Sequence, residues 1–226
     1  MMGSSPFFIH IQCDYVNKKN DNINLQCGLR TYRMIGLDFE AAPKTAQIPS
    51  WNAYHMDVIQ VGMYSNKTGK ILDETVKADV VLTKWHTENT PHLTQSIIKE
   101  SADPCMVASK MTEFIKNECG AKCKMVTYGP SDYIWFMKMY ENCIDKRKEL
   151  HIIKHDVYQH PEYKQNKINI EMIDINDILN LKEPYLKGRS LKALYKHTFN
   201  EEMQNNHNAA ADAKAVAEIA KARFKV

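Results

Sequence analysis

The sequence predicts an α/β protein in which a central mixed sheet, with an antiparallel three-strand meander, is flanked by helices. Three observations predict this class: β-patterned segments joined by short polar turns come first, helical periodicity follows, and an alanine-rich helix comes last. The 226 residues are 44% hydrophobic and 25% charged, within the range of ordinary globular domains. This composition excludes disordered and collagen-like chains.

Three segments have the pattern of the meander strands. The run 33–40 is apolar and ends in two carboxylates, as expected of a buried strand with functional groups at its edge. The segment 55–65 is the second strand, and 70–82 is the third, after the Asn-Lys-Thr-Gly turn at 66–69. Short turns between consecutive strands favour antiparallel pairing.

Helical spacing of apolar residues begins after the meander and predicts helices over 93–100 and 104–117. The remaining elements follow in chain order: a strand at 124–128, a helix at 133–143 capped by Ser131, a strand and turn at 169–181, a short helix at 190–197 and a long alanine-rich helix at 208–225.

Residues 1–30 are expected to form an N-terminal extension with an extra hairpin, in which a strand at 7–16 is followed by a polar turn, and this leaves residues 31–226 as the main domain. No run approaches the roughly 20 apolar residues that span a bilayer, and the N-terminus lacks a signal-peptide pattern. We therefore expect an intracellular protein, cytoplasmic or nuclear, that is not bound to a membrane. The net charge of +3 is compatible with a polyanionic ligand but does not establish one.

Six cysteines are scattered along the chain, which is large enough to fold without disulfide bonds. Their distribution predicts free, mostly buried thiols. Cys119 and Cys123 form the one close pair in the sequence. A zinc site at this pair is the alternative, although the sequence has no second pair at ligand spacing.

Two carboxylates, Asp38 and Glu40, lie two residues apart on a predicted strand, so both side chains point to the same face. Like charges at this separation repel and raise each other's pKa unless a divalent cation lies between them. The alternative is a solvated strand face, but the preceding Met34, Ile35 and Leu37 favour a buried strand. The pair is therefore a candidate metal site.

A second acidic group occurs near the C-terminus, where His207 precedes the last predicted helix and Asp212 lies in its first turns. The small residues at 209–211 would let this helix approach a sheet closely. The alternative is an acid that complements the helix dipole beside a surface histidine. Asp132 is a third candidate at the start of the helix after strand 124–128, or else only a capping residue.

Three segments together resemble the motifs of the DEDDh family of 3′-to-5′ exonucleases, which have a ribonuclease-H-like fold. The segments are GLDFEAAP, MVTYGPSDYIWF and HNAAADAKAVAEI, in the family's order, and the resemblance extends from Met34 to Phe224. The DFEA and YG-x-x-D forms are most similar to the branch that trims small RNAs and histone messages. Two departures are Tyr128-Gly129, where many relatives have His-Asn, and Ala41-Ala42-Pro43 in place of Thr-Gly.

The resemblance implies a metal-dependent exonuclease that releases nucleoside 5′-monophosphates from the 3′ end of single-stranded RNA. Asp38, Glu40, Asp132 and Asp212 would bind two Mg²⁺ or Mn²⁺ ions, because four clustered carboxylates require compensation and oxygen ligands suit these cations. Two such ions catalyse phosphodiester hydrolysis. His207 would accept the proton of the attacking water, a role suited to an imidazole with a pKa near neutrality.

The resemblance also implies where the terminal nucleotide binds. Leu93 and Thr94 match the family's Leu-Thr segment near the 3′-terminal nucleotide, and Phe39 and Ala41 lie within the first motif. Further candidates are three basic residues and three tryptophans, the latter alternatively core or rim residues: Lys187, Arg189, Lys192, Trp51, Trp85 and Trp135.

Other functions remain open at this point. One is a DNA-directed 3′-to-5′ exonuclease of proofreading or repair type, because the contacts that sense the 2′-hydroxyl cannot be identified from the sequence. Another is a catalytically silent nucleic-acid-binding module, although crowded acids have no use in such a protein. A third is a carboxylate-rich surface unrelated to catalysis. The sequence identifies no protein partner.

Overall fold

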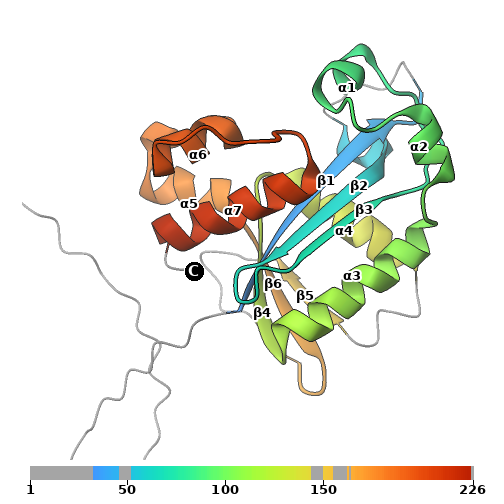
Figure 1. The fold of residues 1–226 in the computed structure, drawn as a ribbon. Helices are drawn as coiled ribbons and strands as arrows, with labels where there is room; N and C mark the ends of the chain where they lie inside the picture. The colour runs from blue at the N-terminus through green and yellow to red at the C-terminus, as the bar shows by residue number, and fades with distance from the viewer. Residues whose placement is uncertain (1–32, 46–51, 144–149, 155–161, 163, 225–226) are drawn as a thin grey trace, which may run out of the picture. The chain divides into compact units, whose positions relative to one another are not determined.

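The computed structural model describes residues 33–45, 52–143, 150–154, 162 and 164–224 (Figure 1). Their six strands form one mixed sheet in the order β3-β2-β1-β4-β6-β5. The strands are β1 (Met34–Pro43), β2 (Met56–Ser65), β3 (Ile71–Thr75), β4 (Lys122–Thr127), β5 (Leu150–Lys154) and β6 (Ile168–Asp174). β1, β2 and β3 pair antiparallel, whereas β1–β4, β4–β6 and β6–β5 pair parallel. The predicted meander within a mixed sheet is confirmed.

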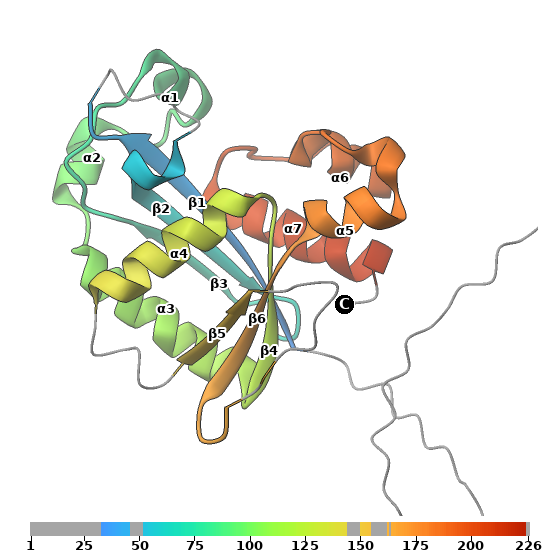
Figure 2. The same cartoon turned by 180° about the vertical axis from the view of Figure 1, so that it is seen from behind.

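Helices cover both faces of the sheet, as Figures 1 and 2 show from opposite sides. One face carries α3 (Pro104–Cys119) and α4 (Pro130–Asn142). The other carries α5 (Ile175–Lys182), α6 (Leu191–Phe199) and α7 (Ala209–Phe224). The shorter elements are α1 (Lys84–Asn89), α2 (Gln95–Glu100), and the 3₁₀ turns η1 (Ala53–His55) and η3 (Pro184–Leu186).

The period-two alternation of β1 separates its apolar side chains from its carboxylates. Leu37 and Phe39 are buried in the core beneath α3 and α4. Asp38 and Glu40 therefore point to the opposite face, the one that α7 covers. The apolar strand pattern thus places two acids under a helix.

Two glycines let α7 lie directly on the sheet. A Cβ on Gly36 would lie 1.9 Å from the carbonyl oxygen of Ala213, and one on Gly62 would lie 2.0 Å from the carbonyl group of Ala209. The backbones of helix and strands therefore touch with no side chain between them. This close approach brings the first turn of α7 to the carboxylates of β1.

Several predicted elements differ in extent from the observed ones. The strand expected over 70–82 ends at Thr75, because Val80 and Leu82 join a separate cluster with Leu93. The segment 169–181 is a strand followed immediately by α5, whose helical cap is Asp174. The short α1 and β5 were not predicted.

Helix α4 begins earlier than expected. Its N-cap is Gly129 with φ 132°, and Pro130 occupies the first turn, so the prediction of Ser131 as cap is wrong. Proline favours the first helical turn because its missing N–H would have no acceptor there. Asp132 consequently lies inside the first turn of α4.

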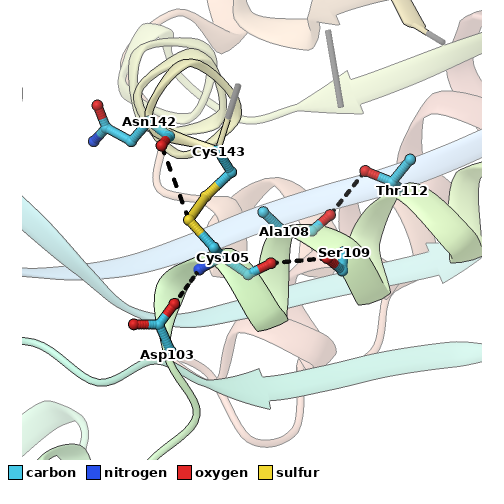
Figure 3. The surroundings of a disulfide bond; sticks show 7 residues. All are labelled: Asp103, Cys105, Ala108, Ser109, Thr112, Asn142 and Cys143. Carbon is cyan, nitrogen blue, oxygen red and sulfur yellow. Dashed lines mark hydrogen bonds between the residues drawn. A yellow bond between two sulfur atoms is a disulfide. The ribbon is translucent and has the colours of Figure 1, made fainter. Parts of the chain in front are cut away.

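The prediction of free thiols is wrong for the four described cysteines. Cys105 bonds to Cys143, 38 residues later, where the start of α3 meets the end of α4 (Figure 3). Cys119 bonds to Cys123, which joins the end of α3 to β4. Because their sulfur atoms bond to each other, Cys119 and Cys123 do not form the alternative zinc site. Helix packing, which the scattered spacing does not reveal, brings the Cα atoms of the first pair to 5.3 Å.

The described core belongs to a unit that runs from Tyr32 to Val226. The extra hairpin, with its expected strand at 7–16, and the rest of the extension at 1–30 lie outside the described residues. Among the helices that the structure describes, none combines the length and apolar character required to cross a membrane.

Candidate metal centre

The strand β1 carries Asp38 and Glu40 beyond the end of its neighbour β4. The parallel pairing ends with Gly36 opposite Val126, so Asp38 lies beside the segment that leads from β4 into α4. On the other side, Glu40 pairs with Gln60 of β2, and a bulge follows between Glu40 and Ala41. The two acids thus lie between β2 on one side and the segment from β4 to α4 on the other.

The first turn of α4 supplies Asp132, which is 4% exposed. Backbone hydrogen bonds at Phe39 and Tyr128 lower its pKa, but they do not offset burial and the charge of Asp174, and the net pKa is raised. Asp174 itself accepts the N–H of Gly129 at 3.0 Å and so holds the turn before α4. This turn places Asp132 next to the backbone of β1.

The start of α7 supplies the other two candidate groups. Asn208 caps the helix, since its Oδ1 accepts the N–H of Ala211 at 3.1 Å. His207 adopts a left-handed backbone conformation, φ 64°, which is uncommon for a residue other than glycine. In this conformation its N–H donates to Asp212 Oδ2 at 3.3 Å. The turn therefore fixes His207 and Asp212 relative to each other.

The fold brings these distant residues to one place. Ligand atoms of Glu40, His207 and Asp212 lie mutually within 4.8 Å, which is a spacing suited to a metal ion. Asp38 and Asp132 lie within electrostatic reach of this group, because Asp132, Asp212 and Glu40 raise the pKa of Asp38, and Asp132 also raises that of Glu40. The five residues singled out from the sequence as catalytic are therefore neighbours.

Burial raises the pKa of all four carboxyl groups, and repulsion by neighbouring acids raises it further in Asp38, Glu40 and Asp132. Burial is the largest cause in each case. The pKa of Glu40 is raised to about 8, and that of Asp212 to about 7. The pKa values of Asp38 and Asp132 are raised well above the ordinary range. Without compensating positive charge, this cluster holds protons near neutral pH.

One oxygen of the cluster is left without a partner. Asp212 Oδ1 is buried and has no hydrogen-bond partner within the described part of the chain. A buried carboxylate oxygen in this condition is costly, whereas a divalent cation would satisfy it. Carboxylate oxygens are donors that suit Mg²⁺ or Mn²⁺, so the acids present fit these metals.

Solved structures with a similar fold exist. The S. pombe Pop2p structure in its Mg²⁺- and Mn²⁺-bound form matches with a TM-score of 0.55 and 13% sequence identity, over 86% of this chain and 84% of that chain. The RNase domain of the yeast Pop2 protein matches with a TM-score of 0.51 and 10% identity, over 87% of this chain and 79% of that one. This chain has the fold of the Pop2 ribonuclease domains.

The Pop2 likeness confirms the ribonuclease-H-like fold that the sequence resemblance implied. At 10–13% identity it is a likeness of fold. No protein-family model matches the chain, and no curated protein matches it in sequence.

On this Pop2-like fold, His207 lies at the rim of the carboxylate cluster. Its ring contacts the exposed Trp85 of α1 edge-to-face, with 5.2 Å between the ring centroids. Burial and the charge of Lys192 lower its pKa below the ordinary value. The imidazole is therefore neutral at neutral pH and can accept a proton.

The four residues predicted to contact the terminal nucleotide take part in core packing, helix capping or backbone hydrogen bonding. Phe39 packs in the core against Trp135, and Leu93 is 2% exposed. Thr94 caps α2 by accepting the N–H of Ile97. The carbonyl oxygen of Ala41 accepts a hydrogen bond from Nε2 of the buried His86 at 3.1 Å.

The basic candidates Lys187, Arg189 and Lys192 are all exposed, and Lys192 lies close enough to His207 to lower its pKa. The hydroxyl of Tyr128 donates to the carbonyl oxygen of Arg189, which ties the segment to the turn before Asp132. Trp51 lies outside the described residues.

Sequence reasoning missed two polar residues near the centre. Asp174 ends β6 and holds the turn before α4; its position at the end of a strand is a signal that could have indicated it. Gln60 lies opposite Glu40 and bonds to the first residue of α7. A single glutamine inside an apolar strand gives no comparable signal.

Proposed function

We propose that this protein is a metal-dependent 3′-to-5′ exonuclease that releases nucleoside 5′-monophosphates from single-stranded RNA. The observation that carries the proposal is a cluster of four carboxyl groups with raised pKa values, three of them buried and Asp38 half-buried, in which one buried oxygen has no partner among the described residues. The Pop2-like fold supports the class of reaction, since the Pop2 comparison structure contains Mg²⁺ and Mn²⁺ and the other Pop2 structure is an RNase domain.

Asp38, Glu40, Asp132 and Asp212 would hold two divalent ions in this proposal. The chemistry available from such a pair is polarisation of a water molecule and stabilisation of charge on the departing 3′-oxygen. The carboxylates would fix the positions of these charges. Their raised pKa values imply that metal binding displaces protons.

His207 is proposed as the general base. The water oxygen attacks the phosphorus of the last phosphodiester, and the proton of the water passes to the imidazole. The bond between phosphorus and the 3′-oxygen of the penultimate nucleotide breaks, and this oxygen takes up a proton from solvent to become a hydroxyl. The products are a nucleoside 5′-monophosphate and a chain shorter by one nucleotide. The lowered pKa of His207 keeps the acceptor nitrogen free of a proton near neutral pH.

The substrate strand is proposed to cross the rim between Trp85 and the basic segment. Trp85 is 47% exposed beside His207 and offers a face on which a base can stack. Lys187, Arg189 and Lys192 are exposed cations near the same centre and would contact phosphate groups. Four residues would lie near the terminal nucleotide without stacking on its base: Phe39, Ala41, Leu93 and Thr94.

Digestion of end-labelled oligonucleotides tests the proposal. A 5′-labelled single-stranded RNA should give a ladder that shortens from the 3′ end in Mg²⁺ or Mn²⁺ and stays intact in chelator. A 3′-labelled RNA should release labelled mononucleotide at once. Equal treatment of a DNA oligonucleotide decides between RNA and DNA as substrate, and binding without cleavage in every metal would contradict the proposal in favour of a silent binding module.

A further inference from the structure

A buried glutamine, Gln60, lies beside the candidate metal centre. It is 2% exposed and pairs with Glu40 across β1 and β2. Directly paired residues of antiparallel strands point to the same face. The Gln60 side chain therefore shares the face of Glu40, beneath the start of α7.

Its carboxamide has three partners, which lie in β3, in the loop between α1 and α2, and at the start of α7. Nε2 donates to Asp73 Oδ1 of β3 at 2.8 Å. Oε1 lies 3.0 Å from Nε2 of His92 and accepts the N–H of Ala209 at 3.4 Å. Because a carboxylate only accepts, Asp73 fixes the amide with its NH₂ group outward and its oxygen toward His92 and Ala209. His92 must then donate from Nε2.

The contact with Ala209 matters because of how the first turn of α7 is packed. Ala209 is 0% exposed, and its backbone lies against Gly62, where no side chain intervenes. Because no side chain lies between helix and strand at Gly62, this contact includes no side-chain hydrogen bond that would orient the turn. The first N–H groups of a helix also lack acceptors within the helix. The Gln60 oxygen satisfies one of them and gives the turn a directional anchor.

We infer that Gln60 is a positioning residue that anchors the first turn of α7 to β2, so that His207 and Asp212 meet Glu40. This inference rests on the proposed function for its kinetic readout. The same amide connects this turn through His92 to the loop containing Leu93 and Thr94, on the proposed substrate side. Gln60 itself contacts no reacting atom.

The main test is Gln60→Met, which keeps the length of the side chain but removes its hydrogen bonds. Loss of a buried hydrogen bond is expected to weaken Mn²⁺ binding, measured by calorimetry without substrate, by at least about fivefold. The turnover number should fall by a similar factor, while KM for an RNA oligonucleotide stays within about twofold of wild type. Gln95→Met is the matched control, since this partly buried glutamine donates to the carbonyl oxygen of Val80 and, within the described part of the chain, forms no side-chain hydrogen bond to α7.

A second variant tests the same contact in case Gln60→Met does not fold. Asp73 is exposed, and Asp73→Asn keeps a hydrogen-bonding partner but lets the Gln60 amide turn over. It should produce a smaller change in the same direction, with a thermal midpoint close to wild type. A purely structural role for Gln60 would lower the midpoint in both variants and leave Mn²⁺ affinity unchanged.

The outcomes separate this inference from the proposed function. If the wild type releases no nucleotide, the proposed function fails, and the Mn²⁺ titrations still decide the role of Gln60. If the wild type binds no Mn²⁺, hydrogen exchange at the backbone amides of residues 209–213 decides, because Gln60→Met should then accelerate it relative to Gln95→Met. A KM change alone, or effects equal to those of the control, would overturn the inference.

Discussion

At Glu40 and Asp212, the raised pKa values make the stability of the metal-free protein depend on pH. Unfolded carboxyl groups ionise near 4.5 and 3.8, whereas in the folded protein these two ionise at about 8 and about 7. The folded state therefore holds more protons between pH 4 and 8, and stability falls as pH rises through this window. In chelator, the thermal midpoint should be lower at pH 8.5 than at pH 5.5, and Mn²⁺ should restore it more at pH 8.5. A midpoint that rises with pH in chelator would contradict the assigned pKa directions.

Replacing Asp212 separates metal binding from folding. Asp212→Asn removes one buried charge, so the metal-free protein should be more stable than wild type at pH 8, whereas the Mn²⁺-dependent shift of the thermal midpoint should be lost. The exposed Asp79→Asn is the control and should change neither quantity. Retention of the full Mn²⁺ shift in Asp212→Asn would exclude this residue from the metal centre.

Replacing His207 tests whether this residue acts as a general base or as a metal ligand. His207→Ala should reduce turnover by at least about 10²-fold with little change in the thermal midpoint, because removal of a general base affects only proton transfer. Mn²⁺ affinity, measured by calorimetry, should stay within about threefold of wild type. A larger loss of affinity would make His207 a ligand, which its position within 4.8 Å of Glu40 and Asp212 also permits.

At the scale of elements, the close contact of α7 with the sheet depends on glycine. Gly62→Ala would force α7 outward, since the new Cβ would lie 2.0 Å from the Ala209 carbonyl group, and should cost at least about 2 kcal/mol of unfolding free energy. Gly69→Asn is the contrasting variant: its φ is 74° but nothing lies within 4 Å, and asparagine tolerates this conformation. Chemical denaturation should show a loss below about 1 kcal/mol there. Equal losses would mean that α7 is not held by backbone contact.

The two disulfides differ in the length of chain that they close. Residues 105 and 143 are 38 apart and residues 119 and 123 only 4 apart, so the first bond restricts the unfolded chain more. On the loop-entropy account, Cys105→Ser should cost about 4 kcal/mol and Cys119→Ser about 2 kcal/mol. Urea denaturation of the two variants checks the order. A greater loss in Cys119→Ser would indicate that native contacts at the end of α3, and not loop closure, dominate.

Periodicity predicted the long elements well and the short ones poorly. The alanine-rich α7 and the amphipathic α3 were expected almost residue for residue, because 16 residues each give several turns of pattern. Helix α1 has 6 residues and β5 has 5, too few for a period to stand out. The change from β6 to α5 at Asp174 was missed because no glycine or proline separates the two elements.

At the scale of the whole molecule, the sequence indicated the candidate acids but not what holds them in place. Asp38, Glu40, Asp132 and Asp212 stand out as acids on an apolar strand or at a helix start, and the resemblance to the DEDDh motifs joins them into one expected ligand set. The roles of Gln60 and Asp174 depend on strand register and on which loops meet at one edge. No local pattern carries that information, since it arises from contacts between residues far apart in the chain.

The expected division of the chain at residue 30 leads to a prediction for the whole molecule. All six strands of the described sheet, the buried core and the five candidate catalytic residues lie between Met34 and Phe224. Because a domain folds on its own when its core is complete, a chain that begins at residue 31 should fold cooperatively and keep the Mn²⁺-dependent rise in thermal midpoint. Calorimetric melting of the full chain and of the truncated chain, each with Mn²⁺ and with chelator, measures both properties. If the truncated chain folds but loses the Mn²⁺ response, the first 30 residues contribute to the metal centre, and the proposed ligand set is incomplete.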